Sequence, residues 1–367
     1  MKIECIKDRI MEAVGRAEKV SGRNPTLPIL SGLYLEAKKN ELIIRATNLD
    51  LGLSTSLSVK VIEEGSVVVP AQILNQFLNS LSKEKTIKIN LKGQTLHVAT
   101  DKTETSIKTL NTEDFPIIPE IKDEESFSLP ARDLVLGLKS VLYAAAVGSM
   151  KPELSSIYLG YEDDHLIFAA TDSFRLAEKK IRTKKTPNFK YVLIPQKNAG
   201  EIVRIFDSVD EDISLTIEEN QIAFRGGEIY LTSRIIDGVF PDYKQIIPKE
   251  ATSKVIVLKQ DLVSSLKTAL IFSDSLNQLH LTISPSEKLF EIESKNNTVG
   301  ENVYAVEAII EGDDLTINVN HRYLTDCFQS IPSDTVNLSF SGQTRPIVVT
   351  GLEDKTFMYL TMPMNKS

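Results

Sequence analysis

Histidine, cysteine and carboxylate side chains are the groups of this 367-residue chain that could carry catalysis or hold a metal. The four histidines are scattered and form neither an HExxH pair nor another metal-ligand spacing; they are His97, His165, His280 and His321. The sequence contains no GxxxxGK phosphate loop, no GxGxxG after a predicted strand and no GxSxG turn for a nucleophilic serine. We therefore expect a protein that is not an enzyme and that uses no metal or other cofactor.

Two acidic runs, residues 162–164 and 311–314, offer oxygen ligands for calcium but lack the ligand spacing of an EF-hand. Both runs fall where hairpin turns are expected, and Asp and Gly are common turn residues. Cys5 and Cys327 belong to no CxxC pair, so we expect two reduced thiols of a cytosolic protein. One alternative stays open, a nuclease whose carboxylates converge on Mg²⁺ without forming a sequence motif.

Basic residues recur in pairs on the predicted helices. Members of a pair stand seven positions apart, nearly two helical turns, and therefore share one stripe of the helix; the pairs are Arg9 with Arg16, Arg132 with Lys139, and Lys197 with Arg204. Acidic residues interrupt the stripes, namely Asp8, Glu12, Asp133 and Glu201. Such sparse positive charge can touch phosphates without gripping them. The alternative is a solvated helix face of mixed charge.

The helices that position these charges belong to a unit that occurs three times. A strand-like lead-in is followed each time by apolar residues at helical spacing. Residues 131–146 carry Leu134, Leu138, Val141, Leu142 and Ala145 on the expected buried stripe, and the copy near residue 260 carries Leu262, Leu266, Ala269 and Leu270. The first copy, after residues 2–5, carries Ile6, Ile10, Val14 and Ala17. Each unit also contains a second strand and helix, near Pro70, Pro195 and Asn320 respectively.

Alternating segments with turn residues predict about eight strands for each unit. Hairpin turns are expected at Lys39-Asn40 and at Asp163-Asp164. The pair Phe115-Pro116 recurs 125 residues later as Phe240-Pro241. A repeat of this length describes whole domains rather than the ~20–50-residue units of a solenoid. We therefore expect three domains, at residues 1–122, 123–248 and 249–367.

Composition limits the kind of protein further. Lys and Arg number 42 against 50 Asp and Glu, a net charge of −8, which argues against a protein that coats nucleic acid with positive charge. The N-terminal residues lack the apolar run of a signal peptide. No stretch approaches the ~18 apolar residues of a membrane span. These features predict a soluble cytoplasmic protein without a membrane partner.

Four short segments carry a family resemblance: LPILSGLYLEA, ATDSFRLA, DGVFPDY and YLTMPM. Together with the threefold repeat, they resemble the beta subunit of bacterial DNA polymerase III, the sliding clamp family, over the whole chain. The resemblance implies an α+β fold of three tandem DNA-clamp domains, each with two helices packed on antiparallel sheets, that forms half of a head-to-tail dimeric ring. It implies a non-catalytic role in DNA replication, in which a homodimer encircles double-stranded DNA and confers processivity. The implied partners are the polymerase III alpha subunit, the clamp-loader delta subunit, and other polymerases and repair proteins that bind through short linear motifs.

The resemblance also implies three sets of site residues. A hydrophobic cleft between the second and third domains would dock partner peptides through Leu154, Thr171, Ser173, Phe174, Arg175, Leu176, Pro241, Gln245, Ile246, Asn320, Tyr323, Pro346, Leu360, Met362, Pro363 and Met364. Candidate DNA contacts are Arg23, Ser149, Lys151 and Lys197. The dimer interface would join Thr105, Ser106 and Ile107 to Ile271 and Phe272 of the partner subunit. For the apolar residues of this set, ordinary core packing is the alternative.

The chain departs from the family pattern at several of these positions. Ser173-Phe174 stands where some relatives carry Gly-His, Gln245 stands at a place that is basic in some relatives, and the chain ends in NKS. Arg23 is offset by one position from the usual arginine. These departures put the preferred peptide sequence in doubt. A monomeric scaffold that does not bind DNA is the remaining alternative.

Overall fold

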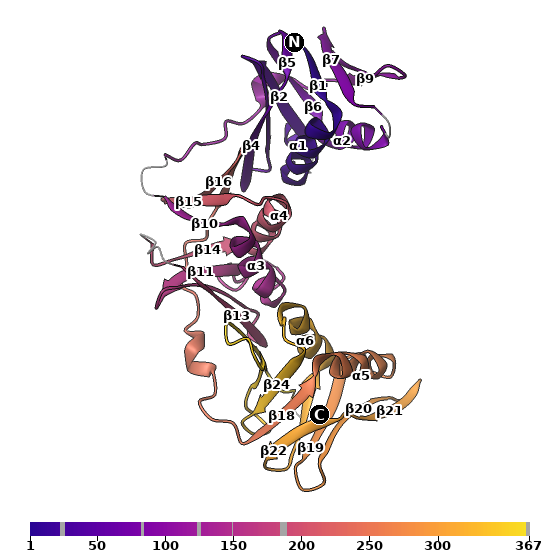
Figure 1. Ribbon diagram of the computed structural model, residues 1–367, viewed down its shortest axis with the longest axis vertical. Helices are drawn as coiled ribbons and strands as arrows, with labels where there is room; N and C mark the ends of the chain where they lie inside the picture. The colour runs from indigo at the N-terminus through magenta and orange to yellow at the C-terminus, as the bar shows by residue number, and fades with distance from the viewer. Residues whose placement is uncertain (23–25, 82–83, 123–125, 149, 184–188, 365–367) are drawn as a thin grey trace. The chain divides into compact units, whose positions relative to one another are not determined.

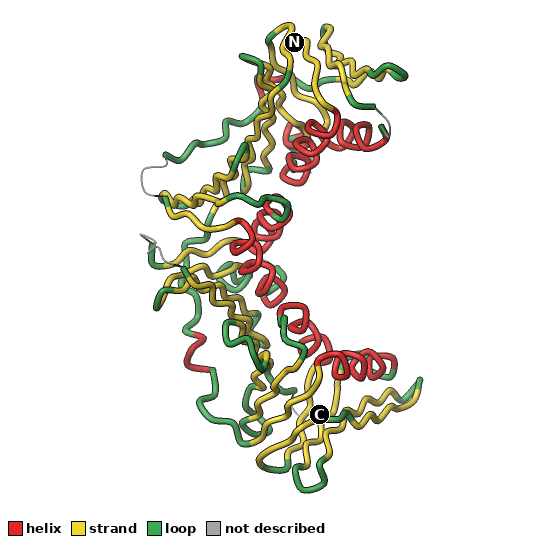
Figure 2. The backbone as a smooth tube through the Cα atoms, viewed as in Figure 1, coloured by secondary structure: helices red, strands yellow, loops and turns green. Residues whose placement is uncertain are grey.

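The computed structural model describes residues 1–22, 26–81, 84–122, 126–148, 150–183 and 189–364. All strand pairs in these ranges are antiparallel, and helices lie beside the sheets (Figures 1 and 2). The chain divides into two compact units. Unit 1 comprises Met1–Val135 and Lys197–Ile235, and unit 2 comprises Leu136–Gln196 and Ile236–Ser367.

Unit 1 contains a five-stranded sheet in the order β5-β1-β7-β8-β9 and an eight-stranded sheet in the order β10-β15-β16-β17-β4-β3-β2-β6. Its strands are β1 (Lys2–Ile6), β2 (Gly32–Lys38), β3 (Glu41–Thr47), β4 (Leu51–Ser58), β5 (Lys60–Glu63), β6 (Gly65–Pro70), β7 (Thr86–Lys92), β8 (Thr95–Ala99), β9 (Glu104–Lys108), β10 (Phe127–Pro130), β15 (Asp212–Glu218), β16 (Gln221–Gly226) and β17 (Ile229–Arg234). Its helical segments are α1 (Lys7–Val20), α2 (Ala71–Ser80), most of α4 (Gln196–Phe206), and the 3₁₀ turns η1 (Pro28–Ser31) and η2 (Thr112–Asp114).

Unit 2 contains a nine-stranded sheet in the order β14-β11-β12-β13-β26-β25-β24-β18-β22 and a four-stranded sheet in the order β21-β20-β19-β23. Its strands are β11 (Ser156–Glu162), β12 (His165–Thr171), β13 (Arg175–Arg182), β14 (Tyr191–Pro195), β18 (Ser253–Leu258), β19 (Gln278–Ser284), β20 (Leu289–Asn296), β21 (Gly300–Ala305), β22 (Ala308–Gly312), β23 (Leu315–Asn320), β24 (Thr335–Phe340), β25 (Ile347–Gly351) and β26 (Phe357–Thr361). Its helical segments are α5 (Lys259–Ile271), α6 (His321–Thr325), the later part of α3 (Ala131–Val141), and the 3₁₀ turns η3 (Leu142–Ala144), η4 (Tyr243–Ile246) and η5 (Asp326–Ser330).

The buried faces of the first helices follow the predicted stripes with three exceptions. Ile6 is the last residue of β1 rather than part of α1, and its side chain is exposed. Leu270 is also exposed, and Ser265 is buried in α5 instead, where its hydroxyl donates to the Leu262 carbonyl (2.8 Å). Leu142 is only half-buried because α3 ends at Val141 and continues as the 3₁₀ turn η3.

The second helices were predicted correctly in position but not always in length. α2 and α4 follow Pro70 and Pro195 directly. The third, α6, spans only His321–Thr325 before the chain tightens into η5. Asn320 caps it by accepting hydrogen bonds from the backbone N–H groups of Arg322 and Tyr323 (2.9 and 3.3 Å).

The two predicted hairpin turns are confirmed. Lys39 and Asn40 have φ of 51° and 65°, and Asp163 and Asp164 have 47° and 60°, the left-handed pair that a two-residue type I′ turn requires. The turn predicted at residues 311–314 is wrong as a hairpin, because β22 pairs with β18 and β23 pairs with β19. Gly312 is needed in this connection, since a Cβ there would lie 2.0 Å from the Thr252 carbonyl oxygen.

Strand pairing within each unit joins segments that are distant in the sequence. In unit 1, β4 pairs with β17, and in unit 2, β13 pairs with β26. The three domains expected at residues 1–122, 123–248 and 249–367 stay a prediction from the sequence repeat. In the described part of the chain, no helix is both long and apolar enough to cross a membrane.

Candidate functional site

The loop between β12 and β13 is held by a compact set of hydrogen bonds. The Thr171 hydroxyl donates to the Arg175 carbonyl (2.7 Å) and accepts from the Ser173 N–H (3.1 Å). The Asp172 carboxylate accepts from the N–H groups of Phe174 (2.9 Å) and Arg175 (3.0 Å). This arrangement forces Ser173 to φ = +78°, a conformation that costs a residue with a Cβ on the order of 1 kcal/mol. Glycine, which the family resemblance implies for some relatives at this position, adopts a positive φ without this cost because it has no Cβ.

The loop presents an aromatic side chain to solvent. Phe174 is 58% exposed although it is large and apolar. Its ring stacks on Tyr323 of α6, with centroids 6.2 Å apart and planes 17° apart. The Arg175 guanidinium also lies against the Tyr323 ring, with its central carbon 4.8 Å from the centroid. Tyr323 therefore joins two neighbouring residues of the loop.

The Arg175 guanidinium is held between two carboxylates. Its Nε donates to Asp172 (2.9 Å), and Nη1 donates to Asp326 of η5. The Asn320 side chain is also engaged, since it caps α6 and donates to the Leu276 carbonyl (3.0 Å). Both residues are predicted to offer hydrogen bonds to a peptide, but Nε and Nη1 of Arg175 and both polar side-chain atoms of Asn320 already have partners within the chain.

The C-terminal strand lies directly beside the loop. Leu176 of β13 pairs with Leu360 of β26, and both are fully buried. The Met362 N–H donates to the Phe174 carbonyl (2.8 Å), which extends the pairing past the end of β26. Met362, Pro363 and Met364 are half-buried. The segment therefore provides flexible thioether side chains beside an exposed aromatic ring.

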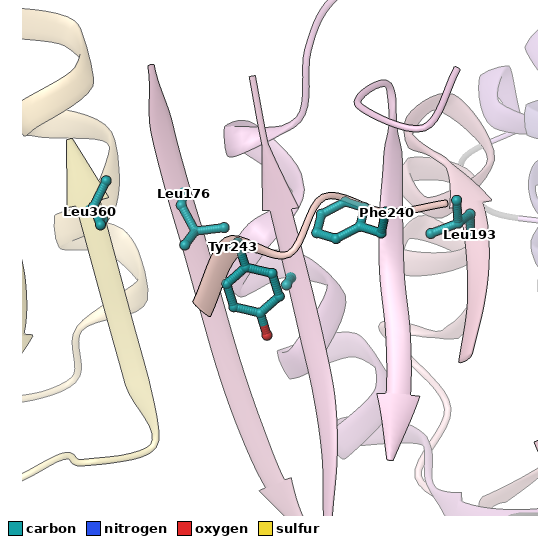
Figure 3. Packing of buried hydrophobic residues seen from close by; sticks show 6 residues of the cluster. Leu176, Leu193, Phe240, Tyr243 and Leu360 are labelled. Carbon is teal, nitrogen blue, oxygen red and sulfur yellow. The ribbon is translucent and has the colours of Figure 1, made fainter. Parts of the chain in front are cut away.

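The segment around η4 is anchored by two rings. Figure 3 shows Phe240 and Tyr243 packed over the sheet between Leu193 and Leu360, in a cluster that also includes Leu176. The Tyr243 hydroxyl donates to the buried Glu178 carboxylate (2.6 Å). Burial, reinforced by Glu178, raises the pKa of Tyr243, so it remains a neutral donor.

The same segment exposes residues between and after these two rings. Pro241, Gln245 and Ile246 face solvent, and the Gln245 amide donates to Asp242 (2.7 Å). Contacts bring together half of the predicted docking residues, namely Thr171, Ser173, Phe174, Arg175, Leu176, Tyr323, Leu360 and Met362. The others lie in the same compact unit: Leu154, Pro241, Gln245, Ile246, Asn320, Pro346, Pro363 and Met364.

Sequence reasoning missed four residues that shape this surface. Asp172 and Tyr243 lay within the quoted segments ATDSFRLA and DGVFPDY but were assigned no role. The buried Glu178 carboxylate accepts the Tyr243 hydroxyl, and Asp326 holds Arg175. No sequence signal marked Glu178 or Asp326, because their roles depend on partners distant in the sequence.

The residues proposed for the dimer interface occupy sheet edges and a helix end. β9 is an edge strand of the five-stranded sheet, with Ser106 exposed and Thr105 half-buried. Ile107 is buried, so its side chain packs within its own subunit. Ile271, at the end of α5, is 66% exposed, and the adjacent Phe272 is half-buried.

The residues proposed to contact DNA are partly described. Lys151 and Lys197 are exposed, whereas Arg23 and Ser149 lie outside the described residues. Several of the paired helix charges are neutralised by neighbouring acids: Arg16 by Glu12, Arg132 by Asp133, and Arg204 by Glu201. The positive stripes are therefore weaker than the sequence alone indicated.

The described residues contain no group of three or more His, Cys, Asp or Glu side chains that could hold a metal ion. His321 is buried and donates through Nε2 to the Leu266 carbonyl (2.8 Å). Burial, with a contribution from Glu4, raises the pKa of the Cys5 thiol to about 12. Burial also raises the pKa of Cys327, so both thiols are unreactive near neutral pH.

Comparisons with known proteins cover the whole chain. Family models of the DNA polymerase III beta subunit match in order: the N-terminal domain at residues 1–119, the central domain at 129–242 and the C-terminal domain at 244–365. The chain is 28% identical to the beta sliding clamp of Synechococcus elongatus and 26% identical to that of Bacillus subtilis, with 99% of each chain covered. The solved sliding clamp of Bacillus subtilis matches with a TM-score of 0.93 at 25% identity, and the beta subunit of Thermotoga maritima with 0.94 at 24%, each over 100% of both chains.

Proposed function

This chain belongs to the DNA polymerase III beta subunit family, and we propose that it works as a DNA sliding clamp that closes around duplex DNA as a homodimer and tethers the replicative polymerase. The family assignment and the non-catalytic role rest on three tandem domain matches that together span nearly the whole chain. That threefold match is the observation that carries the proposal.

The charge balance suits a topological tether better than an electrostatic binder. The affinity of a protein that neutralises many phosphates falls steeply with salt. This chain has a net charge of −8, and its helix cations are partly paired with acids. A closed ring does not need high phosphate affinity, because retention depends on closure. Lys151 and Lys197, with Arg23 and Ser149, remain the proposed DNA contacts.

We assign the docking of partner peptides to the surface around Phe174. Three features support this: the exposed ring of Phe174, the adjacent Met362 and Met364, and the exposed Ile246. Methionine side chains repack easily around different apolar anchors, and aromatic residues often dominate binding energy at interfaces. The expected ligand is a short linear segment with a large apolar residue, supplied by polymerases, the clamp loader or repair proteins.

Dimerisation is proposed to use the open sheet edges. β9 and β21 each present one unpaired side within the described part of the chain. Pairing an edge of one subunit with an edge of its partner would satisfy the free backbone groups and close a head-to-tail ring. The exposed Ile271 at the end of α5 would add apolar area to this interface. We also propose that the protein is cytoplasmic, as replication in bacteria requires.

Primer extension tests this function. The cognate polymerase is assayed on a primed circular template with this protein, the clamp loader and ATP, in the presence of a trap that prevents rebinding. We expect product length per binding event to rise by at least tenfold when the protein is present. Products of unchanged length would contradict the clamp function, and Mg²⁺-dependent loss of template with the protein alone would favour a nuclease.

A further inference from the structure

Unit 1 contains a hollow on its eight-stranded sheet. At the equivalent position of unit 2, the ring of Tyr243 fills the space. The hollow has a volume of about 570 Å³ and lies between the eight-stranded sheet and the segment that follows η2. Its walls include Tyr34, Arg45, Ser54, Ile118 and Tyr230.

The two places correspond through their loops. In unit 1, the Thr47 hydroxyl donates to the Leu51 carbonyl (2.7 Å) and accepts from the Leu49 N–H (3.0 Å). The Asn48 side chain accepts from the two following N–H groups. Leu49 has φ = +77°, against +78° at Ser173. The loop at residues 47–51 thus repeats the loop at residues 171–175 bond for bond.

The strands beside these loops correspond as well. In unit 1, Tyr34 pairs with Arg45, Arg45 with Ser54, and Ser54 with Tyr230 across four neighbouring strands. The equivalent row in unit 2 is Tyr158, Ala169, Glu178 and Met358. The ring contact of Tyr34 with Phe115 (5.4 Å) likewise matches that of Tyr158 with Phe240 (5.3 Å).

One substitution in the repeat leaves the hollow open. Phe240-Pro241 follows Phe115-Pro116 by 125 residues, so Ile118 stands in the place of Tyr243. In unit 2 the Tyr243 ring covers the sheet, and its hydroxyl reaches Glu178. In unit 1 the shorter Ile118 packs close to Gly52, and Ser54 stands in the place of Glu178. The ring and its hydroxyl are therefore missing from this place. Its walls keep a Tyr-Phe ring pair, but they carry Arg45 in the place of Ala169 and Tyr230 in the place of Met358.

We propose that this hollow is a binding site for a neutral phenol ring. The ring would lie against the Arg45 guanidinium, which already contacts the Tyr34 ring at 5.4 Å, and its hydroxyl would bond to Ser54. The Arg45 charge is balanced by Glu36 (3.2 Å), and Glu120 also lines the hollow. These carboxylates disfavour an anionic ligand. The phenol can come from a free phenolic compound or from a tyrosine of a partner segment.

The wall opposite the sheet is fixed in place. The Tyr230 hydroxyl accepts from the Ile121 N–H (2.8 Å) and donates to the Pro119 carbonyl (2.9 Å). Arg225 lies over the Tyr230 ring, 4.2 Å from its centroid, and donates to the Ile121 carbonyl. These bonds fix the covering segment to β16 and β17 beside the hollow, so the site is formed before a ligand arrives.

The test uses the full-length protein and saturation-transfer NMR with p-cresol as the probe. We expect saturable binding with a Kd on the order of 1 mM, as for small fragments, and about fivefold weaker binding of toluene, which lacks the hydroxyl. Ile118→Tyr should abolish p-cresol binding by filling the hollow. The matched control, Ile62→Tyr, should bind normally, because Ile62 is 54% exposed and does not line the hollow.

Two further measurements keep the result decisive. Ser54→Ala should weaken the binding of p-cresol about fivefold and leave the binding of toluene unchanged. This variant tests the proposed hydrogen bond even if Ile118→Tyr does not fold. A peptide with the sequence FPDYKQ distinguishes a tyrosine of a partner segment from a free phenolic compound. If the peptide binds at least tenfold more tightly than p-cresol, the ligand is a partner's tyrosine. If it binds less tightly than that, the ligand is a free phenol. Equal binding of toluene and p-cresol, or no saturable binding of either, would overturn the proposal without affecting the clamp function.

Discussion

Removing one hydroxyl group tests whether Tyr243 anchors the η4 segment to the sheet. In Tyr243→Phe, the ring remains in its cluster but the 2.6 Å hydrogen bond to Glu178 is lost. Tyr243 and Glu178 are 6% and 5% exposed, so water cannot readily replace the missing donor. The Lys180 ammonium lies 3.5 Å from the Glu178 carboxylate, and the Lys180 side chain is 43% exposed.

The magnitude follows from the charge and burial of the acceptor. A hydrogen bond to a charged group contributes roughly 1.5–3 kcal/mol, and an unsatisfied buried acceptor adds to the loss. We therefore expect Tyr243→Phe to destabilise the protein by about 2 kcal/mol, with a fall in Tm of roughly 4–8 °C. Tyr161→Phe is the matched control, because that hydroxyl bonds to Asp164 (3.1 Å) in an exposed hairpin and should cost less than about 0.5 kcal/mol.

Urea denaturation followed by far-UV circular dichroism measures both variants. A double-mutant cycle with Glu178→Gln should show that the two losses are not additive, since both changes affect one bond. Equal stability of Tyr243→Phe and Tyr161→Phe, or additive losses in the cycle, would refute the role of the Tyr243–Glu178 hydrogen bond as the anchor of the η4 segment.

Three further predictions concern acid stability, the dimer and docking. Burial lowers the pKa of His321, so the folded protein favours the neutral imidazole. The free energy of unfolding should therefore be highest above pH ~6.5 and should fall as the pH drops toward the lowered pKa. Urea denaturation at several pH values should show a shallower decline for His321→Gln. Ile271→Arg should raise the dimer Kd at least tenfold in analytical ultracentrifugation, whereas Leu276→Arg, also at an exposed position, should not. Deleting residues 362–367 should abolish polymerase binding in a pull-down and leave the dimer intact; retained stimulation of the polymerase would disprove the docking surface.

The sequence predicted the repeat and the local turns well because both depend on nearby residues. Helix stripes follow from apolar spacing, and the turns at Lys39 and Asp163 follow from residue types that tolerate positive φ. Errors arose at helix ends, where packing against the rest of the unit decides the outcome. Leu270, near the end of α5, is exposed. Within the same helix Ser265 is buried, which is possible because its hydroxyl donates to the Leu262 carbonyl.

The candidate site was only partly predictable. Its residues came from family resemblance, and the structure brings many of them together. The ion pair between Arg175 and Asp326 and the hydrogen bond between Tyr243 and Glu178 join residues far apart in the sequence. No local pattern marks such contacts. The sequence also could not decide whether Ile107 packs in its own subunit or at the interface, because strand alternation does not tell which face of a sheet is covered.

Retention on DNA that has no free ends tests the central claim most directly. The protein is loaded onto a nicked circular plasmid, passed over a sizing column in 0.5 M NaCl, and then treated with an enzyme that cuts the plasmid once. The account predicts that the protein comigrates with the circle despite the salt and leaves within minutes of linearisation. Dissociation from the intact circle in high salt, or equal retention on circular and linear DNA, would show that the protein binds DNA by contact and not by enclosing it.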